Sequence, residues 1–356
     1  SLRTASRRPF SGIWITSPGG RILFRESIKT TMNGCTETDK PLISIVMAVY
    51  EPNLQWFREQ LDSLEAQTYP NLELLVLDDC SPTVPFETVR QYVAQSIRSF
   101  LYQVARNEKN LGSNGTFEKL TRQAKGKYIA YCDQDDVWLP EKLEILYTEI
   151  QQKHAAMGYC DMTVMDAMGY QIASSLRDIR PRLQYLQGEN LFEQYFFRNC
   201  TAGCSMLIQA DIAKMAIPFP PRTVADHWLA IWAAKKGVIA FTEQKMVKYR
   251  QHHNNQTGIL FGVQNKKSYY QVRVIPLQER LDWLAHRDSV PSSVRAFVRA
   301  RTMGDLFGIW KGRKYSPKEA SLEIAMRFMP DAVFKFCIAR LKNESVGYRC
   351  GRTAWL

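Results

Sequence analysis

Residues 128–142 contain the side chains best suited in this chain to hold a metal ion. An apolar run at the start of the stretch predicts a buried strand, and Asp133, Asp135 and Asp136 follow directly after it. A proline and helix-forming residues come next, so residues 133–139 are expected to form a loop between strand and helix. Neighbouring carboxylates repel, which raises their pKa values unless a cation lies among them. Their oxygens suit Mg²⁺ or Mn²⁺, ions that commonly bind nucleotide phosphates. A solvated acidic turn is the alternative.

Two further polar clusters stand at the ends of predicted strands. Tyr50 and Glu51 close an apolar run that begins at residue 42, and Asp79 closes the next run. The predicted strands are 42–50, 72–79, 102–105 and 128–131, and they alternate with predicted helices at 54–64, 86–97, 114–124 and 141–152. This alternation indicates an α/β fold with a parallel sheet. Because ligands bind at the carboxyl ends of such strands, the three polar clusters are expected to meet at one edge.

The second part of the chain supplies further candidate positions. It contains a predicted strand at 159–165, a surface loop at 173–187, a strand at 200–208, a helix at 225–234 and a polar loop at 249–258. Gly203 indicates a close approach of another group to its strand. Asp226 stands near the start of its helix, where an aspartate most often caps backbone N–H groups. Beyond residue 262 the chain is predicted to be helical, with a basic end.

The bulk composition limits the class of protein. The chain has 356 residues, 45% of them hydrophobic, and a net charge of +12. These values allow a substantial core and favour an anionic partner, such as a nucleotide, a nucleic acid or lipid headgroups. Eight scattered cysteines without a CxxC pair favour free thiols in a reducing compartment. No apolar run is long enough to span a membrane, and the first residues lack the apolar segment of a signal peptide.

We divide the chain into three parts. Residues 1–40 are basic and have no sustained apolar period, so they are interpreted as a disordered extension. This extension is either a basic arm, a transit-like segment, or a product of cloning or upstream translation with Met32 as the native start. Residues 41–260 are expected to form the α/β domain, and residues 261–356 a helical, basic region.

Several of these segments resemble the family 2 glycosyltransferases, which are inverting enzymes with the GT-A fold, a mostly parallel central sheet flanked by helices. The matching segments are 44–51, 67–81, 110–112, 133–135 and 226–228, and together with the loop that ends at residue 258 they span about two thirds of the chain. Asp133-Gln134-Asp135 falls where the family has its DXD motif, and Asp226 falls where it has its catalytic base. Cys80 departs from the Gly or Asn usual in the family.

The resemblance implies a role for each matching residue. Nucleotide binding is expected of Ala48, Val49, Tyr50, Glu51, Asp79, Asn110, Gly112, Asp133 and Gln134, with Asp79 reading a pyrimidine base. Metal binding is expected of Asp135, Asp133 and His252, for Mg²⁺ or Mn²⁺. Contact with the donor or acceptor sugar is expected of Asp136, Trp138, Gly203, His227, Trp228 and Arg250, although Trp228 could equally be a core residue. Arg250, His252 and His253 could close over the diphosphate, or be solvated loop residues.

The reaction expected from this resemblance is chemically coherent. The donor is a nucleotide-diphosphate sugar, and the acceptor is a hydroxyl of a glycan or a lipid-linked glycan. A divalent ion neutralises the departing diphosphate, and Asp226 takes the proton of the acceptor hydroxyl as general base. The segment Asp-Gln-Asp-Asp-Val-Trp is similar to that of bacterial rhamnosyltransferases of surface polysaccharides. This similarity suggests dTDP-L-rhamnose as donor and O-antigen or capsule biosynthesis as the process.

Two other classes of function remain as alternatives. Asp133-Gln-Asp-Asp-Val137 also fits the motif of haloacid-dehalogenase-type phosphatases, with Asp133 as nucleophile and Asp135 as general acid. In that class, however, the motif follows the first strand, and Asp79 would have no role. A nucleic-acid-binding module would explain the charge, but no aromatic-basic surface motif accompanies it. Nucleic acid is therefore not expected as a partner.

The C-terminal region contains one helix that could bind a membrane surface. Val333, Phe334, Cys337, Ile338 and Leu341 recur at helical spacing, with Lys335, Arg340 and Lys342 around them. A basic amphipathic helix of this kind can lie in an anionic membrane interface. The alternative is a helix packed on the preceding domain. We expect a cytoplasmic protein, peripheral on the inner face of the cytoplasmic membrane in the first case.

Overall fold

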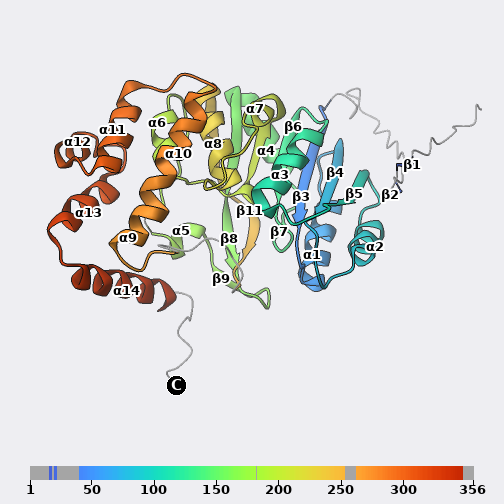
Figure 1. Ribbon diagram of the computed structural model, residues 1–356. Coiled ribbons are helices and arrows are strands. Elements are labelled where there is room, and N and C mark those ends of the chain that lie inside the picture. Colours follow the sequence, from blue (N-terminus) through green and yellow to red (C-terminus); the bar gives the residue numbers. More distant parts are fainter. Residues whose placement is uncertain (1–15, 18–19, 22–39, 182, 253–261, 348–356) are drawn as a thin grey trace, which may run out of the picture.

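A sheet of nine strands forms the centre of the computed structural model, which describes residues 16–17, 20–21, 40–181, 183–252 and 262–347 (Figure 1). Its strand order is β5-β4-β3-β6-β10-β8-β11-β7, and β9 pairs with β8. The strands are β3 (Ile43–Val49), β4 (Leu72–Asp78), β5 (Leu101–Arg106), β6 (Tyr128–Cys132), β7 (Val137–Trp138), β8 (Ala155–Met165), β9 (Gln171–Ala173), β10 (Met206–Gln209) and β11 (Val238–Arg250). Two short strands, β1 (Thr16–Ser17) and β2 (Gly20–Arg21), pair with each other. The remainder of residues 1–39 lies outside the described residues.

The first half of the sheet is parallel, as the alternation of strands and helices predicted. β3 pairs in parallel with both β4 and β6, and β4 pairs in parallel with β5. Val49 is in register with Asp78, and Met47 is in register with Cys132. The carboxyl ends of β3, β4 and β6 therefore lie side by side, which brings the residues after them to one edge.

Helices cover both faces of the sheet and bury two apolar cores. The helices that follow the strands of the domain are α1 (Leu54–Glu65), α2 (Phe86–Ser96), α3 (Gly112–Gln123), α4 (Lys142–Lys153), α5 (Leu176–Ile179), α6 (Phe192–Phe197), α7 (Ala210–Met215) and α8 (Ala225–Lys236). One core contains apolar side chains of α1, α2 and α4, and the other contains those of α3, α6, α7 and α8. Burial on both faces explains the continuous apolar sequences of β3 and β4.

The second half of the sheet differs from the prediction in several places. Residues 200–205 do not form a strand, because Gly203–Ser205 make a 3₁₀ turn (η2) before the short strand β10. β10 runs antiparallel between β6 and β8. The predicted loop 133–139 contains β7, which pairs with β11. β11 was not predicted, and it takes in the first two residues of the predicted loop 249–258; residues 253–258 lie outside the described part.

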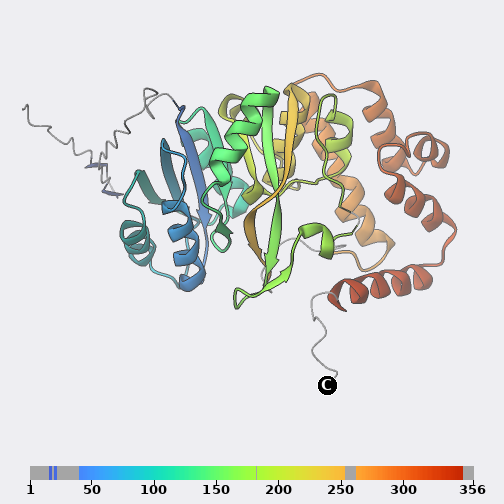
Figure 2. The same cartoon turned by 180° about the vertical axis from the view of Figure 1, so that it is seen from behind.

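β11 and β8 are long neighbouring strands in the second half of the sheet (Figure 2), which β10 joins to the parallel half. Their pairing is parallel, with register irregularities between Thr242 and Val247. At the far end of this pair, Val247 lies opposite Trp138 of β7. β11 therefore carries its last residue, Arg250, to the acidic loop that β7 closes.

The C-terminal region is helical, as predicted, and packs at the end of the molecule opposite β5 (Figure 1). It contains α9 (Lys266–Tyr269), the π-helical turn η3 (Tyr270–Val274), α10 (Ile275–Ala285), α11 (Ser292–Met303), α12 (Leu306–Lys311), α13 (Pro317–Phe328) and α14 (Asp331–Gly347). α10 and α11 join the core that α8 occupies. A buried ion pair between Arg301 and Glu323 links α11 to α13. Among the described residues, no helix is long and apolar enough to cross a membrane.

Candidate active site

Asp79 lies at the carboxyl end of β4 and holds the start of α3. Its carboxylate accepts hydrogen bonds from Asn107 Nδ2 at 2.9 Å and from the backbone N–H groups of Leu111 at 2.7 Å and Gly112 at 2.8 Å. Asn110 Oδ1 accepts from Gly112 N as well, at 3.0 Å. Gly112 has a φ of +71°, a conformation that strongly favours glycine. Asn107 was not predicted, although it directly follows β5 and thus carries the same strand-end signal as Asp79.

The segment after β3 is tied to its neighbours on both sides. The carboxylate of Glu51 accepts from the backbone N–H groups of Thr83 at 2.8 Å and Val84 at 3.1 Å, and from the Thr83 hydroxyl. These hydrogen bonds hold the pKa of Glu51 below its ordinary value. The Gln134 amide bonds to both backbone groups of Tyr50, at 2.9 and 3.0 Å. The ring of Tyr50 is 47% exposed, so it is the accessible group of this segment.

Two residues predicted to bind the nucleotide lie within β3 itself. The side chain of Val49 is fully buried, and Ala48 packs against the core on the other face of the sheet. Val49 O accepts from Asp79 N at 2.7 Å. The structure therefore gives the side chains of this pair a packing role.

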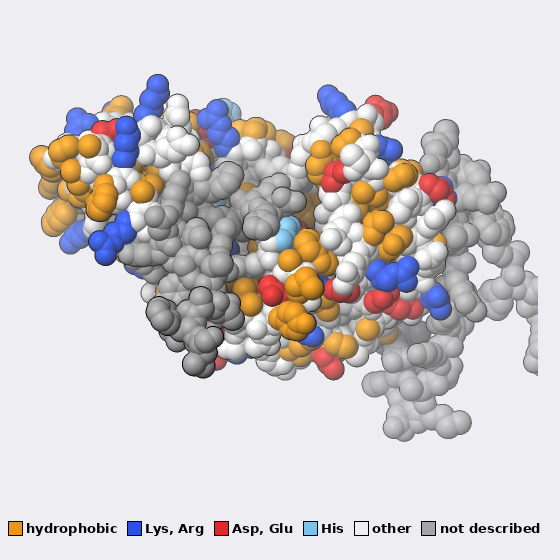
Figure 3. All heavy atoms as spheres, turned by 90° about the horizontal axis from the view of Figure 1, so that it is seen from below, with side chains coloured by type: hydrophobic (Ala, Val, Ile, Leu, Met, Phe, Trp, Pro, Cys, Tyr) orange, Lys and Arg blue, Asp and Glu red, His pale blue; other side chains and the backbone are white. Residues whose placement is uncertain are grey.

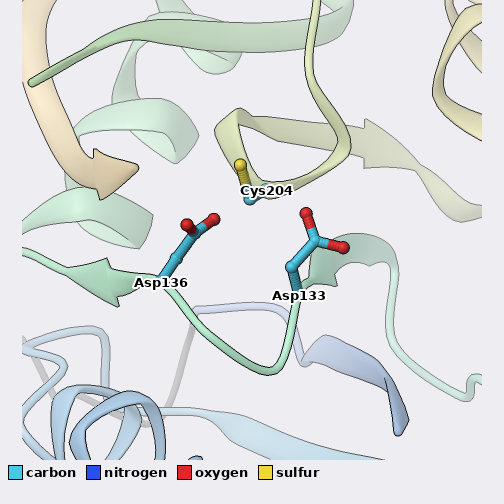
Figure 4. Close-up of side chains that lie close together, drawn as sticks. All are labelled: Asp133, Asp136 and Cys204. Carbon is cyan, nitrogen blue, oxygen red and sulfur yellow. The ribbon is translucent and has the colours of Figure 1, made fainter. Parts of the chain in front are cut away.

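The acidic loop brings two carboxylates against a thiol. Ligand atoms of Asp133, Asp136 and Cys204 all lie within 4.8 Å of one another, and the side chains converge from the loop and from η2 (Figure 4). Asp136 is 1% exposed; its Oδ1 accepts from Arg250 N at 2.9 Å, and its Oδ2 has no hydrogen-bond partner among the described residues. Burial, followed by repulsion from nearby carboxylates, raises the pKa of Asp133 to about 7 and that of Asp136 well above its ordinary range.

This cluster fits a cation. A buried carboxylate oxygen without a donor and two carboxyl groups with raised pKa values are both stabilised by a positive ion among them. The oxygens of Asp133 and Asp136 suit a hard divalent ion. The thiol of Cys204 suits it less, because burial raises its pKa well above the ordinary value and keeps it protonated.

Asp135 points to a different partner. Its Oδ2 lies 2.6 Å from His252 Nε2, and the ring of His252 lies 4.9 Å from that of Trp56. Asp135 and His252, two of the three predicted metal ligands, therefore lie together in the structure although they are 117 positions apart in the sequence. The third, Asp133, is in the neighbouring cluster with Asp136. His253 lies outside the described residues.

Arg250 is part of the scaffold under the acidic loop. It is 1% exposed, and its Nε donates to Asp135 O at 2.8 Å while its backbone N–H holds Asp136. Its guanidinium also bonds Glu59 and lies 5.3 Å from the centre of the Trp56 ring. These donors are engaged within the protein, and contact of the side chain with a sugar or the diphosphate stays a prediction.

Asp226 lies in the first turn of α8, beside η2. It is not the N-cap residue, a position that Val224 occupies. Its Oδ1 accepts from Asn199 Nδ2 at 3.2 Å and from His227 N. A Cβ at Gly203 would lie 3.8 Å from the Cβ of Asp226, so this glycine is where the chain passes the carboxylate.

The environment of Asp226 suits a general base. Burial raises its pKa to about 6, against the opposing effect of the hydrogen bonds from His227, Gly203 and Asn199. A helix N-terminus by itself lowers the pKa of a carboxylate, but for Asp226 desolvation is the larger effect. A group with this pKa is mostly ionised at neutral pH and still has appreciable proton affinity. Its charge also contributes to the raised pKa of Asp133, so the two carboxylates share one region.

Three aromatic residues that were predicted to contact a sugar are in the core. Trp228 is fully buried, and its indole N–H donates to Ala216 O at 2.7 Å. His227 is 7% exposed with Nε2 2.6 Å from Tyr195 O, and burial holds its pKa well below the ordinary value. Trp138 is 2% exposed. This burial agrees with the core role given as the alternative for Trp228, because α8 is buried on nearly all sides. Contact of these side chains with a sugar stays a prediction.

Lys142 is a functional candidate that was not predicted. It is fully buried at the start of α4, donates to Cys204 O at 2.6 Å and lies over the ring of Trp138. Burial lowers its pKa to about 8. Its charge acts on Asp133 by lowering the pKa of that carboxyl. The signal was present in the sequence, since Lys142 ends the stretch 128–142, but a lysine at a helix start is normally solvated.

The chain is similar to known glycosyltransferases. Residues 44–214 match the family model described as glycosyl transferase family 2. The chain is 27% identical over 247 residues to an uncharacterized glycosyltransferase of Methanocaldococcus jannaschii, a match over 67% of this chain and 80% of that protein. It is 26% identical over 249 residues to a Bacillus subtilis protein named as a putative teichuronic acid biosynthesis glycosyltransferase, TuaG, over 69% and 91% of the two chains.

Solved structures agree on the fold. Residues 1–349 of S. aureus TarS, in complex with UDP-GlcNAc, align with a TM-score of 0.54 at 14% identity, over 88% of this chain and 93% of that one. The mannosyltransferase PcManGT from Pyrobaculum calidifontis, in complex with GDP-Man and Mn²⁺, aligns with a TM-score of 0.52 at 15% identity, over 88% and 84%. The chain therefore contains a family 2 glycosyltransferase domain with the GT-A fold. The acidic motif follows β6, the fourth strand of the sheet, which argues against the phosphatase alternative.

Proposed function

We propose that this glycosyltransferase moves a sugar from a nucleotide-diphosphate donor to a hydroxyl of a glycan or lipid-linked acceptor, with inversion, in cell-surface polysaccharide biosynthesis. The observation that carries the proposal is the convergence at one sheet edge of the Asp79 loop, the acidic loop and, from much later in the chain, Asp226. The name of TuaG supports the process, since that protein is named for teichuronic acid biosynthesis.

In this proposal the nucleotide lies against the ends of β3 and β4. The ring of Tyr50 is exposed there, and Asp79 Oδ2 accepts one hydrogen bond in the structure, so it retains capacity for a pyrimidine N–H. Asn110 and Gly112 form the loop beside it. Glu51 and Gln134 act indirectly, because their side chains are engaged in holding the strand ends.

Mg²⁺ or Mn²⁺ would be held by Asp135 and His252, with Asp133 from the neighbouring cluster. When bound, such an ion neutralises the charge that develops on the departing nucleotide diphosphate. PcManGT was solved with Mn²⁺, which supports a divalent ion in this fold. The buried Asp136 holds the loop through Arg250 N and contributes negative charge behind the ligands.

Asp226 accepts the proton of the acceptor hydroxyl as that oxygen attacks the anomeric carbon. Asn199 and the backbone of Gly203 orient the carboxylate. A base on one side of the anomeric carbon and the diphosphate on the other give a single displacement with inversion. We retain dTDP-L-rhamnose as the proposed donor, on the strength of the motif similarity; TarS and PcManGT, which were solved with two other donors, illustrate that one fold accepts different sugars.

A donor panel tests the proposal. The protein is incubated with Mn²⁺ and UDP-, dTDP- or GDP-sugars, and release of the nucleoside diphosphate is measured with and without a hydroxyl acceptor. We expect turnover with one donor class, and the anomeric configuration of the product, determined by NMR, should be inverted. Release of inorganic phosphate from phosphomonoesters, with no turnover of any nucleotide sugar, would favour the phosphatase instead.

A further inference from the structure

The helix that the sequence indicated for membrane binding buries part of its predicted apolar face, while Val333 is 46% exposed. Phe334 and Ile338 of α14 are 0% and 2% exposed, and they pack with Tyr269, Val274 and Met326. For Phe334 and Ile338 the structure agrees with the alternative of a packed helix, because the C-terminal helices cover them. The side chains of Leu341 and Lys342 lie outside the described residues.

A different surface of the same region is apolar and exposed. Met303 at the end of α11 is 68% exposed, and Phe307 and Trp310 of α12 are 70% and 51% exposed. The rings of Phe307 and Trp310 stack with their centres 6.2 Å apart. We call Met303, Phe307 and Trp310 the α12 patch. Figure 3 shows hydrophobic side chains gathered with Lys and Arg at this end of the molecule.

The packing of α12 directs its aromatic side chains outward. Its inner face consists of Gly308 and Ile309, with Gly312 just after the helix, and Ile309 is 1% exposed. A Cβ on Gly308 would lie 2.6 Å from the Cβ of Ala300, and one on Gly312 would lie 2.2 Å from the Phe297 ring. α12 thus sits against α11 at a distance that only glycine allows. Rotating it to bury Phe307 or Trp310 would place a large ring where no Cβ fits.

Arginine side chains surround the patch. Arg313 lies over the Trp310 ring at 4.2 Å, and Arg299 Nε contacts Met303 Sδ at 3.5 Å. Arg327 reaches the turn after Met303, where its Nη1 lies 3.6 Å from the Cβ position of Gly304. In the part of the chain that the structure describes, none of these three arginines forms an ion pair with a carboxylate. The patch therefore combines exposed rings with uncompensated positive charge.

We propose that the α12 patch docks the protein on a membrane surface rich in anionic lipid headgroups. Tryptophan and phenylalanine insert into the boundary between headgroups and acyl chains, and arginines beside them bind the phosphates. Each arginine near an anionic surface increases the partition coefficient by roughly fivefold. A second protein would also cover an apolar patch, but a ring of unpaired arginines matches a uniformly anionic surface. This proposal goes beyond the transfer reaction and does not depend on its donor or acceptor.

Flotation with vesicles tests the proposal on the full chain. Wild type should float with phosphatidylcholine–phosphatidylglycerol vesicles at low salt, less at high salt, and little with phosphatidylcholine alone. Phe307→Ser/Trp310→Ser should reduce the partition coefficient by at least roughly tenfold, and Arg313→Gln by roughly fivefold. The matched control is Met168→Ser/Tyr170→Ser, which removes side chains that are 78% and 70% exposed on the turn between β8 and β9.

Three results would overturn the proposal. Wild type that stays unbound on anionic vesicles removes its basis, and an equal loss in the control assigns the effect to general hydrophobicity. If wild type sediments as a dimer and Phe307→Ser/Trp310→Ser sediments as a monomer, the α12 patch binds a second copy of the chain instead of a membrane. Because both replaced side chains are exposed, the double variant should keep the melting temperature of wild type, and this is checked first.

Discussion

Replacing Asp226 by asparagine separates its proposed chemical role from its structural one. Asparagine retains a side-chain oxygen that can accept from Asn199 and from the backbone N–H of residue 227, but it cannot take a proton. If Asp226 is the general base, kcat should fall by roughly 100-fold or more, while donor binding is unchanged. The wild-type rate should rise with pH and level off above a midpoint near the folded-state pKa of about 6, since the base must be ionised.

The same substitution has a predictable effect on stability. Burial raises the pKa of Asp226 from its ordinary value of 3.8 to about 6, so the folded state holds a proton over a pH range where the unfolded state has lost it. Stability from this group is therefore fully present below about pH 4 and is lost as pH rises to about 6. The unfolding free energy falls by at most about 3 kcal/mol over this range, since raising a pKa by one corresponds to roughly 1.4 kcal/mol. Solvent screening makes it smaller, because the side chain is partly exposed.

Asp226→Asn should therefore unfold at a higher temperature than wild type at pH 8, and this difference should shrink to about half at pH 5. Thermal unfolding at both pH values and initial rates from pH 5 to 9 measure the two effects. As a control, Asn199→Ala removes a hydrogen bond that lowers the pKa, so the midpoint of its rate profile should move upward. Near-normal activity of Asp226→Asn would refute the assignment of the base, and a lower melting temperature at pH 8 would refute the role of burial.

Three further predictions concern the nucleotide, the metal and the C-terminal helices. Asp79→Ala should weaken uracil or thymine nucleotide binding in calorimetry, and it should also lower the unfolding free energy by about 1–3 kcal/mol, because buried donors that Asp79 satisfies lose their acceptor. Unchanged nucleotide affinity would contradict its role at the base. Asp135→Asn, or excess EDTA on wild type, should abolish transfer with the circular dichroism spectrum preserved; activity that persists in EDTA would remove the metal from the proposal. Arg301→Met leaves Glu323 buried without its partner, so it should destabilise the chain by about 3–5 kcal/mol in urea unfolding, and a loss under about 1 kcal/mol would show that water reaches the pair.

The parallel half of the sheet was predictable because its signals are local. Each strand of this half is an apolar run followed by a polar residue, and the register of β3 with β4 and β6 brings those residues to one edge. Asp79 and Asp133 were found in this way. The hydrogen bonds that Asp79 accepts from the backbone of Leu111 and Gly112 could not be predicted, since they depend on the position of that loop in the folded chain.

β11 was missed for a physical reason. Residues 243–245 are exposed, and the register against β8 shifts on either side of Lys245, so the strand has no continuous alternation in its sequence. α8 shows the opposite case. Its sequence is apolar around the whole helix, which predicts burial on all sides, and this signal outweighs the family position that suggested a surface role for Trp228. The burial of Lys142 was not predicted, because a lysine at a helix start is normally solvated.

The acidic loop is held in place before any ligand binds. Gln134 fixes one side of it to β3, Arg250 holds the other side through Asp135 O and Asp136, and Lys142 fastens the turn that carries Cys204. A loop free to move would separate its carboxylates and lower their mutual repulsion. These cross-links prevent that relaxation, so the fold keeps Asp133 and Asp136 together despite pKa values raised by burial and repulsion. In the proposed function this repulsion favours a bound cation, since Asp133 is already in place as a ligand and Asp136 adds negative charge behind it. In the proposed function, the buried arginine and lysine are the rigid support of the cation site, and their donors are engaged within the protein.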